Sequence, residues 1–263
     1  MRGGVGTEQH YTFGDGDVAA LRLRYLAETY ASSSSALLRS VGPVEGGAVD
    51  LGCGPGYTTQ LVAEALRPSW LVGLDRSARL VAAARARLPE LRFLEHDVTA
   101  APFPTPPAAA VYSRFLLTHL PDPAAAVRTF AGALAPGGRL VLEETASLTP
   151  EHPTLQRYYE LVERLQAHYG QRFGIGVGLG DLLRDAGLEV DEAGVAAHLL
   201  PADRMARLHA LNIRTWGADP FARDHFDPVE LSRIMATLDR VASGDEPAPP
   251  VRSAMGQAVA RRR

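Results

Sequence analysis

Short apolar runs alternate with stretches of helical periodicity between residues 48 and 143. Five of the runs have the length of strands, and three of the stretches between them have the spacing of amphipathic helices. Because the runs are continuously apolar, both faces of the sheet should be buried, which indicates a parallel sheet covered by helices on both sides. The predicted strands are 48–51, 70–74, 91–95, 108–112 and 139–143, and the predicted helices are 58–66, 77–88 and 123–134.

Outside this region, the apolar residues follow a different pattern. Apolar spacing in 17–40 predicts two short helices separated by the serine run 32–35. A long amphipathic segment at 152–169 predicts an inserted helix that packs over another part of the molecule. We therefore expect a helical cap at 1–42 and a main domain at 43–263 with a helical insertion at 150–175. Further predicted elements are helices at 181–186, 203–216 and 228–242 and strands at 188–198 and 251–260.

Charge and composition exclude several classes of function. The chain has 263 residues, 46% of them hydrophobic, which is enough for one large domain. Its net charge of −3 provides no basic field for a nucleic acid, so we expect none as a partner. All 27 basic residues are arginine, which excludes Schiff-base chemistry and phosphate loops that need lysine. Cys53 is the single cysteine, so disulfides within the chain and cysteine-built zinc sites are excluded.

Compartment and assembly are also matters of expectation. A lone thiol is typical of a reducing compartment, and no stretch approaches the roughly 18 apolar residues of a membrane span. We therefore expect a cytoplasmic protein with no membrane partner. A homodimer is the commonest assembly of soluble oligomeric proteins, so we expect a second copy of the chain as a possible partner.

The segment VDLGCGPGYTT, at residues 49–59, is the strongest local motif. A buried strand ends there in Gly52, Gly54 and Gly56, and a helix follows. Glycines let a backbone approach a ligand closely, and the first N–H groups of the helix are free to bind it. A plain strand-to-helix turn needs fewer glycines, so the motif indicates a ligand site.

Two kinds of nucleotide ligand fit this motif. A nicotinamide or flavin fingerprint, G-x-G-x-x-G, needs a third glycine where this chain has Tyr57, which disfavours an oxidoreductase. The alternative is a nucleoside with a short charged tail. Asp75 follows roughly 20 residues later, at the end of the second strand, where its carboxylate can accept both ribose hydroxyls in either case.

Together with LVGLDRS, LRFLEHDVTA, VYSRFLLTHLPDP and LAPGGRLVLEE, this motif resembles the class I S-adenosylmethionine-dependent methyltransferases over about residues 45–145. The resemblance implies a doubly wound α/β fold with a seven-stranded Rossmann-like sheet. Five strands would be parallel, two would be C-terminal, and the last would be antiparallel. It also implies S-adenosyl-L-methionine as the cofactor.

The resemblance assigns roles to individual residues. The backbone at Gly52 and Gly54 would hold the methionine end of the cofactor, and Asp75 would bind the ribose. In the N-terminal cap, an aromatic residue and an arginine would reach the methionine carboxylate, and Tyr11 and Arg22 match them, unless Tyr11 only packs and Arg22 is solvated. Arg76, Asp97 and Val98 would contact the adenine. Ser113 and Arg114 would line the pocket between the cofactor and the acceptor. There are simpler alternatives for two of these residues: a role for Asp97 only in stabilising a turn, and a role for Arg114 only as a charge on the surface.

Methyl transfer is an in-line displacement, so holding donor and acceptor in line provides much of the catalysis. A base is needed only if the attacking atom loses a proton. His119 is the best candidate because it follows the fourth strand, although a histidine in the apolar run LLTHL can equally be a packed residue. The weaker alternatives are His10, Glu144, His152, Tyr158, Tyr159 and His168.

Motifs that the chain lacks limit the range of possible acceptors. The segment after the fourth strand, SRFLL, has no Asn/Asp-Pro-Pro-aromatic motif of nucleic-acid amino methylases, and no acidic cluster suggests a metal. Residues 145–263 provide aromatic side chains that either form core or favour an apolar or aromatic acceptor. We therefore expect methylation of a small organic molecule at O, N or C, in secondary metabolism. A protein of the same fold that catalyses a non-methylating reaction, or only binds, is the alternative. The aromatics are Tyr158, Tyr159, Tyr169, Phe173, Trp216, Phe221 and Phe226.

Overall fold

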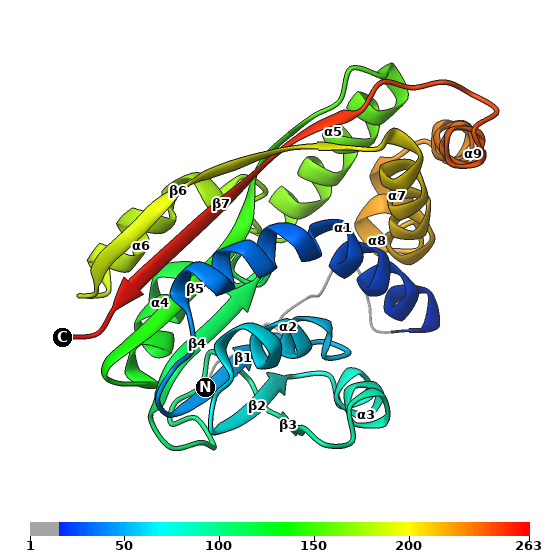
Figure 1. Ribbon diagram of the computed structural model, residues 1–263. Coiled ribbons are helices and arrows are strands. Elements are labelled where there is room, and N and C mark those ends of the chain that lie inside the picture. Colours follow the sequence, from blue (N-terminus) through cyan, green and yellow to red (C-terminus); the bar gives the residue numbers. More distant parts are fainter. Residues whose placement is uncertain (1–15) are drawn as a thin grey trace, which may run out of the picture.

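A computed structural model describes residues 16–263, and within them seven strands form one sheet in the order β3-β2-β1-β4-β5-β7-β6 (Figure 1). The first five strands are parallel to one another, whereas β7 is antiparallel to both β5 and β6. The predicted seven-stranded sheet with an antiparallel last strand is confirmed. The strands are β1 (Gly47–Leu51), β2 (Trp70–Asp75), β3 (Arg92–Glu95), β4 (Ala108–Arg114), β5 (Leu134–Thr149), β6 (Glu189–Leu200) and β7 (Val251–Arg261).

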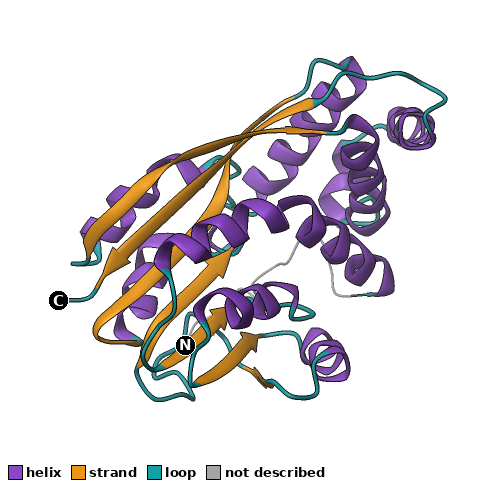
Figure 2. Cartoon of the chain, viewed as in Figure 1, coloured by secondary structure: helices purple, strands orange, loops and turns teal. Residues whose placement is uncertain are grey.

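Helices cover both faces of the sheet, as its continuously apolar strands predict (Figure 2). On one face, α2 (Tyr57–Leu66) and the C-terminal part of α1 (Asp17–Val41) pack on β1, β4 and β5. On the other face lie α4 (Pro123–Gly132) and α6 (Leu179–Asp185). The short α3 (Ala78–Arg87) packs against Phe93 of β3.

The strand order reverses between β1 and β4, and this reversal places the ligand site. Leu51, at the end of β1, pairs with Leu74 of β2 on one side and with Ser113 of β4 on the other. The three strands therefore end level with one another. In a doubly wound sheet the crevice at such a reversal is where ligands bind.

The N-terminal prediction of two short helices is wrong, because α1 is one helix of 25 residues. The serine run does not interrupt it, since two of its hydroxyls find partners elsewhere in the fold. Ser33 Oγ lies 3.2 Å from His198 Nε2, and Ser34 Oγ donates to Glu143 Oε2 over 2.9 Å. Serine tends to break helices by bonding to nearby backbone, and these distant partners remove that competition.

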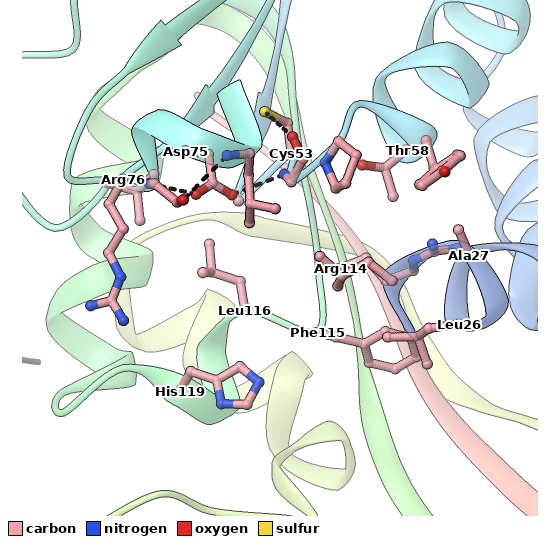
Figure 3. Close-up of a pocket in the computed structure, with 18 of the residues that line it drawn as sticks. Leu26, Ala27, Cys53, Thr58, Asp75, Arg76, Arg114, Phe115, Leu116 and His119 are labelled. Atoms are coloured by element: carbon pink, nitrogen blue, oxygen red, sulfur yellow. Dashed lines mark hydrogen bonds between the residues drawn. The ribbon is translucent and has the colours of Figure 1, made fainter. Parts of the chain in front are cut away.

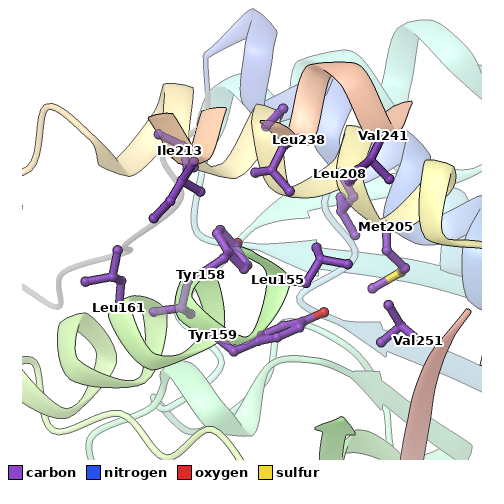
Figure 4. Close-up of a cluster of buried hydrophobic side chains, with 14 of the residues drawn as sticks. Leu155, Tyr158, Tyr159, Leu161, Met205, Leu208, Ile213, Leu238, Val241 and Val251 are labelled. Atoms are coloured by element: carbon purple, nitrogen blue, oxygen red, sulfur yellow. The ribbon is translucent and has the colours of Figure 1, made fainter. Parts of the chain in front are cut away.

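A layer of helices beyond one end of the sheet is larger than the predicted insertion. It contains α5 (Pro153–His168), α7 (Ala202–Trp216), α8 (Pro220–His225) and α9 (Pro228–Ser243), and α7 also contacts α1. Their facing side chains form a separate buried cluster, shown in Figure 4. The predicted helix at 152–169 is confirmed as α5, whereas α8 was not predicted. No helix among residues 16–263 combines the length and apolarity that crossing a membrane requires.

Leu155 tests how much this helical layer contributes to stability. Its side chain is fully buried in the cluster of Figure 4, so Leu155→Ala should lower the free energy of unfolding by about 2–5 kcal/mol. Leu199→Ala is the matched control, because Leu199 is 67% exposed and should change stability by roughly 0.5 kcal/mol or less. Urea denaturation of both variants gives the comparison, and equal losses would show that the layer is not a packed core.

Candidate functional site

The glycine loop after β1 forms one wall of the site. Gly52, Gly54 and Gly56 all have positive φ values, of 66°, 51° and 80°, which side chains rarely adopt. A Cβ atom at Gly52 would lie 3.0 Å from Leu116, whereas one at Gly54 would meet only Leu23, at 3.7 Å. The loop backbone at Gly54 therefore lies open on the side where a ligand can approach.

Asp50, on the strand that precedes the glycine loop, stabilises the start of the helix that follows it. Its buried carboxylate accepts hydrogen bonds from Thr58 and Thr59 at the start of α2, over 2.7 and 2.6 Å. Burial raises the pKa of Asp50 to about 6, although the two threonine hydroxyls counteract the shift. The acid before the glycines thus fastens the strand to the helix that follows.

Asp75 faces the same loop from the end of β2 (Figure 3). One carboxylate oxygen accepts the Gly54 N–H and the other the Ser77 N–H, each over 2.9 Å. These bonds hold the carboxylate in one orientation beside the glycine loop.

A cavity with about 1070 Å³ of empty space lies between these loops and α1. It extends from Arg22 on α1, past Gly54 and Asp75, to Asp97 and Val98 after β3. Most residues predicted to touch the cofactor therefore border one space, which we call the cofactor cavity. They are Arg22, Gly52, Gly54, Asp75, Arg76, Asp97 and Val98, together with His119 and Arg114.

Among the described residues, one that was predicted to touch the cofactor does not border this cavity. Ser113 is 1% exposed and lies within β4 behind the lining, and Tyr11 falls outside the described residues. Asp97 borders the cavity and also serves its own turn, because it accepts both the N–H and the hydroxyl of Thr99. Arg114 is no surface charge: it is 8% exposed and donates to Ser34 over 2.8 Å.

The sequence prediction missed the apolar side of this cavity. Leu23, Leu26 and Ala27 of α1 line it opposite the glycine loop, and Figure 3 shows Leu26 beside Phe115. Their helical spacing within 17–40 was the available signal, because it marked an apolar face without saying what that face covers.

Glu144 holds the turn that follows β4. Its buried Oε1 accepts the backbone N–H groups of Leu116 and Leu117, over 2.7 and 2.6 Å. This fixes Phe115, which has a positive φ of 54°. Burial raises the pKa of Glu144 to about 8 despite these hydrogen bonds. Glu144, one of the weaker predicted bases, is thus part of the turn.

His119 ends the 3₁₀ turn η1 (Leu117–His119) and borders the cofactor cavity (Figure 3). Burial, and to a lesser extent the positive charge of Arg22, lower its pKa to about 3. The ring is therefore neutral at physiological pH.

A second cavity, with about 670 Å³ of empty space, adjoins the first between α1, α5 and α7. The two share Arg22, Leu26, Phe115 and His119 as lining residues. Of the predicted aromatics, Tyr158, Tyr159 and Phe173 line this second space, which we call the acceptor cavity. The other four lie in or against the buried core of the helical layer: Tyr169, Trp216, Phe221 and Phe226.

The remaining predicted bases lie away from both cavities or outside the described chain. His152 lies 3.1 Å from Glu246, His168 stacks on Phe221, and His10 precedes residue 16. Within residues 16–263 no group of His, Cys, Asp and Glu is arranged to hold a metal ion.

Comparisons with known proteins agree with this geometry. A family model described as a methyltransferase domain matches residues 48–138. A trans-aconitate 2-methyltransferase from Methylobacterium radiotolerans is 32% identical over 210 residues, which cover 76% of this chain and 78% of that protein.

Solved structures share the fold at low identity. A putative methyltransferase from Bacillus halodurans has a TM-score of 0.60 and 18% identity, over 87% of this chain and 98% of that one. The [4+2]-cyclase SpnF has a TM-score of 0.51 and 18% identity, over 96% of this chain and 87% of that one. At such identities the likeness concerns the fold alone.

Glu144 makes stability depend on pH in a defined direction. Its pKa in the folded protein is raised to about 8, so the folded state keeps a proton that the unfolded state loses above the ordinary pKa of 4.5. Its contribution to stability is therefore full below about pH 4.5 and is lost as the pH rises towards 8, by at most about 1.4 kcal/mol per pH unit.

Glu144→Gln should flatten this dependence, because glutamine keeps an acceptor oxygen for the turn but does not titrate. Urea unfolding at intervals between pH 5 and 8 measures the slope. Glu163→Gln, at an exposed position of α5, should leave the slope unchanged. Identical slopes in the wild type and Glu144→Gln would refute the assignment.

Proposed function

Because the chain belongs to the class I S-adenosylmethionine-dependent methyltransferases, we propose that it methylates a small, mostly apolar organic acceptor at oxygen, nitrogen or carbon. The observation that carries this proposal is the junction of the two cavities. The cofactor cavity has the glycine loop and Asp75, the acceptor cavity has aromatic walls, and they adjoin at Phe115 and His119.

The residues around the cofactor cavity suit the parts of this cofactor. We propose that the backbone at Gly52 and Gly54 and the guanidinium of Arg22 bind its amino-acid end, as arginine pairs well with carboxylates. Asp75 would accept the ribose hydroxyls, because it lines this cavity at the end of the second strand, where an acid binds ribose in such sheets. The adenine would lie against Arg76, Asp97 and Val98. Contacts from Tyr11 and Ser113 stay predictions.

The bound cofactor supplies a methyl group on a sulfonium, and the protein has to bring an acceptor atom into line with it. Here Phe115, Leu26 and His119 belong to both cavities and can set that alignment. α1 and the helical layer supply apolar walls that keep water from the junction. Catalysis would then rest mainly on positioning, with a base needed only for an acceptor atom that carries a proton.

We also propose a place for the enzyme in cytoplasmic secondary metabolism. The aromatic cavity supports an acceptor of that kind, and the buried free thiol of Cys53 suits a reducing compartment. Whether two copies associate stays a prediction.

A non-methylating reaction is the second candidate, and the fold likeness to the [4+2]-cyclase SpnF is the observation that favours it. Formation of S-adenosylhomocysteine from S-adenosylmethionine in the presence of candidate acceptors separates the two. Methyl transfer predicts one equivalent of this product for each acceptor consumed, whereas rearrangement predicts product without any. An oxidoreductase predicts tight binding of NAD and none of S-adenosylhomocysteine.

Asp75→Ala should weaken binding of S-adenosylhomocysteine by about 1–3 kcal/mol, the loss expected for hydrogen bonds to a charged group. Isothermal titration measures this, with Asp181→Ala on exposed α6 as the control that should bind normally. Asp75 also accepts the backbone N–H groups of Gly54 and Ser77, so the substitution could disturb the loop itself. A second ligand separates that effect from the loss of a ribose contact. An analogue without ribose hydroxyls should lose much less affinity, and an equal loss for both ligands would contradict the ribose contact.

His119 is the candidate catalytic residue at the junction. With a pKa of about 3 it is a weak proton acceptor at pH 7, and we propose that it orients the acceptor as a neutral hydrogen-bonding group. His119→Asn should then lower kcat by roughly tenfold or less and leave the shape of the pH–rate profile unchanged. A fall of roughly 100-fold or more, with one limb of the profile lost, would instead establish His119 as a general base.

A further inference from the structure

The described residues that line the acceptor cavity carry almost no charge. Among the described residues that line it, Arg22 is the one side chain with a formal charge at neutral pH. Its two histidines, His119 and His209, are both neutral, because burial lowers the pKa of each to about 3. Among the described residues of the cavity wall, Arg22 is therefore the one cation with which an anionic acceptor could pair.

Arg22 is already assigned to another partner. It borders both cavities, and the proposed function places it on the carboxylate of the cofactor. A second carboxylate brought into the acceptor cavity would lose its hydration without gaining a further cation from the described walls. Buried charges are tolerated only when they are paired and hydrogen-bonded, so such a ligand is disfavoured.

Three buried polar side chains line the wall that α5 and α7 form. Gln166, His209 and Asn212 are 3%, 3% and 7% exposed. Tyr159 OH lies 2.6 Å from His209 Nε2, and Asn212 Nδ2 donates to Tyr158 OH over 2.7 Å. These bonds fix the orientations of His209 and Asn212.

Each of the three keeps one buried polar atom that has no hydrogen-bond partner among residues 16–263: Gln166 Oε1, His209 Nδ1 and Asn212 Oδ1. Buried polar atoms are nearly always hydrogen-bonded in native proteins, so three of them around one cavity need a reason. A ligand that supplies hydrogen bonds at this wall is such a reason.

We infer that the acceptor is an uncharged, mostly apolar molecule whose polar groups hydrogen-bond to Gln166, His209 and Asn212. This inference rests on the proposed function and narrows it. It also separates this enzyme from the trans-aconitate 2-methyltransferases it resembles, because trans-aconitate is a tricarboxylate and the described walls of this cavity have no set of cations to receive one.

Two probes with the same ring system but different charge test the inference. 2-Naphthol is neutral at pH 7 and 2-naphthoate is an anion, and both are titrated calorimetrically into the full chain saturated with S-adenosylhomocysteine. We expect 2-naphthol to bind at least about tenfold more tightly than 2-naphthoate. trans-Aconitate should bind more weakly still and should not be methylated in the presence of S-adenosylmethionine.

The polar wall is tested with Gln166→Leu and Asn212→Leu. Each substitution should weaken the binding of 2-naphthol roughly fivefold, as expected for one lost hydrogen bond. The binding of naphthalene, which has no hydroxyl, should stay unchanged. A merely structural role would weaken both probes together. Arg214→Ala on the exposed side of α7 is the control, and Gln166→Leu remains informative if the loss of the Tyr158 contact unfolds Asn212→Leu.

The outcomes separate this inference from the function on which it rests. Tighter binding of 2-naphthoate, methylation of trans-aconitate, or no binding of 2-naphthol to the loaded protein would overturn the uncharged acceptor and leave methyl transfer standing. Failure of S-adenosylhomocysteine itself to bind would overturn the proposed function, and the inference with it.

Discussion

Glu143, a buried carboxylate near the middle of β5, is the interaction on which the site depends. It accepts hydrogen bonds from Ser34 of α1 and Tyr112 of β4, over 2.9 and 3.0 Å, and from Gln257 of β7, over 3.4 Å. Arg114 joins the network through Ser34. α1 provides a wall to both cavities, so this carboxylate determines where that wall lies. Burial raises the pKa of Glu143, while the positive charge of Arg114 and the hydrogen bonds lower it.

Glu144 performs the matching task on the opposite face of the same strand. Successive residues of a strand point to opposite sides, so Glu143 faces α1 while Glu144 reaches the turn after β4. One carboxylate positions the helix, and the next positions Phe115 through the backbone of Leu116 and Leu117. Two adjacent residues thus hold both sides of the junction between the cavities.

The two halves of the site differ in their physical chemistry. The cofactor cavity offers charged groups and open backbone, such as Asp75, Arg76 and the glycine loop, beside the apolar face of α1. The acceptor cavity offers aromatic surface and neutral polar groups held by α5 and α7. Arg22 borders both cavities and is the one cationic side chain among the described residues that line the acceptor cavity.

The sequence by itself determined the features that depend on local order along the chain. Strand and helix periodicity predicted the sheet, and three glycines at a strand end predicted a ligand site. The resemblance of these motifs to a known family implied the cofactor and a role for Asp75. Only the tertiary structure decided what depends on distant segments: that α1 continues through its serines, that Arg114 is buried, and that His119 is neutral. Gln166, His209 and Asn212 form no motif, because only the packing of α5 against α7 brings them to one wall.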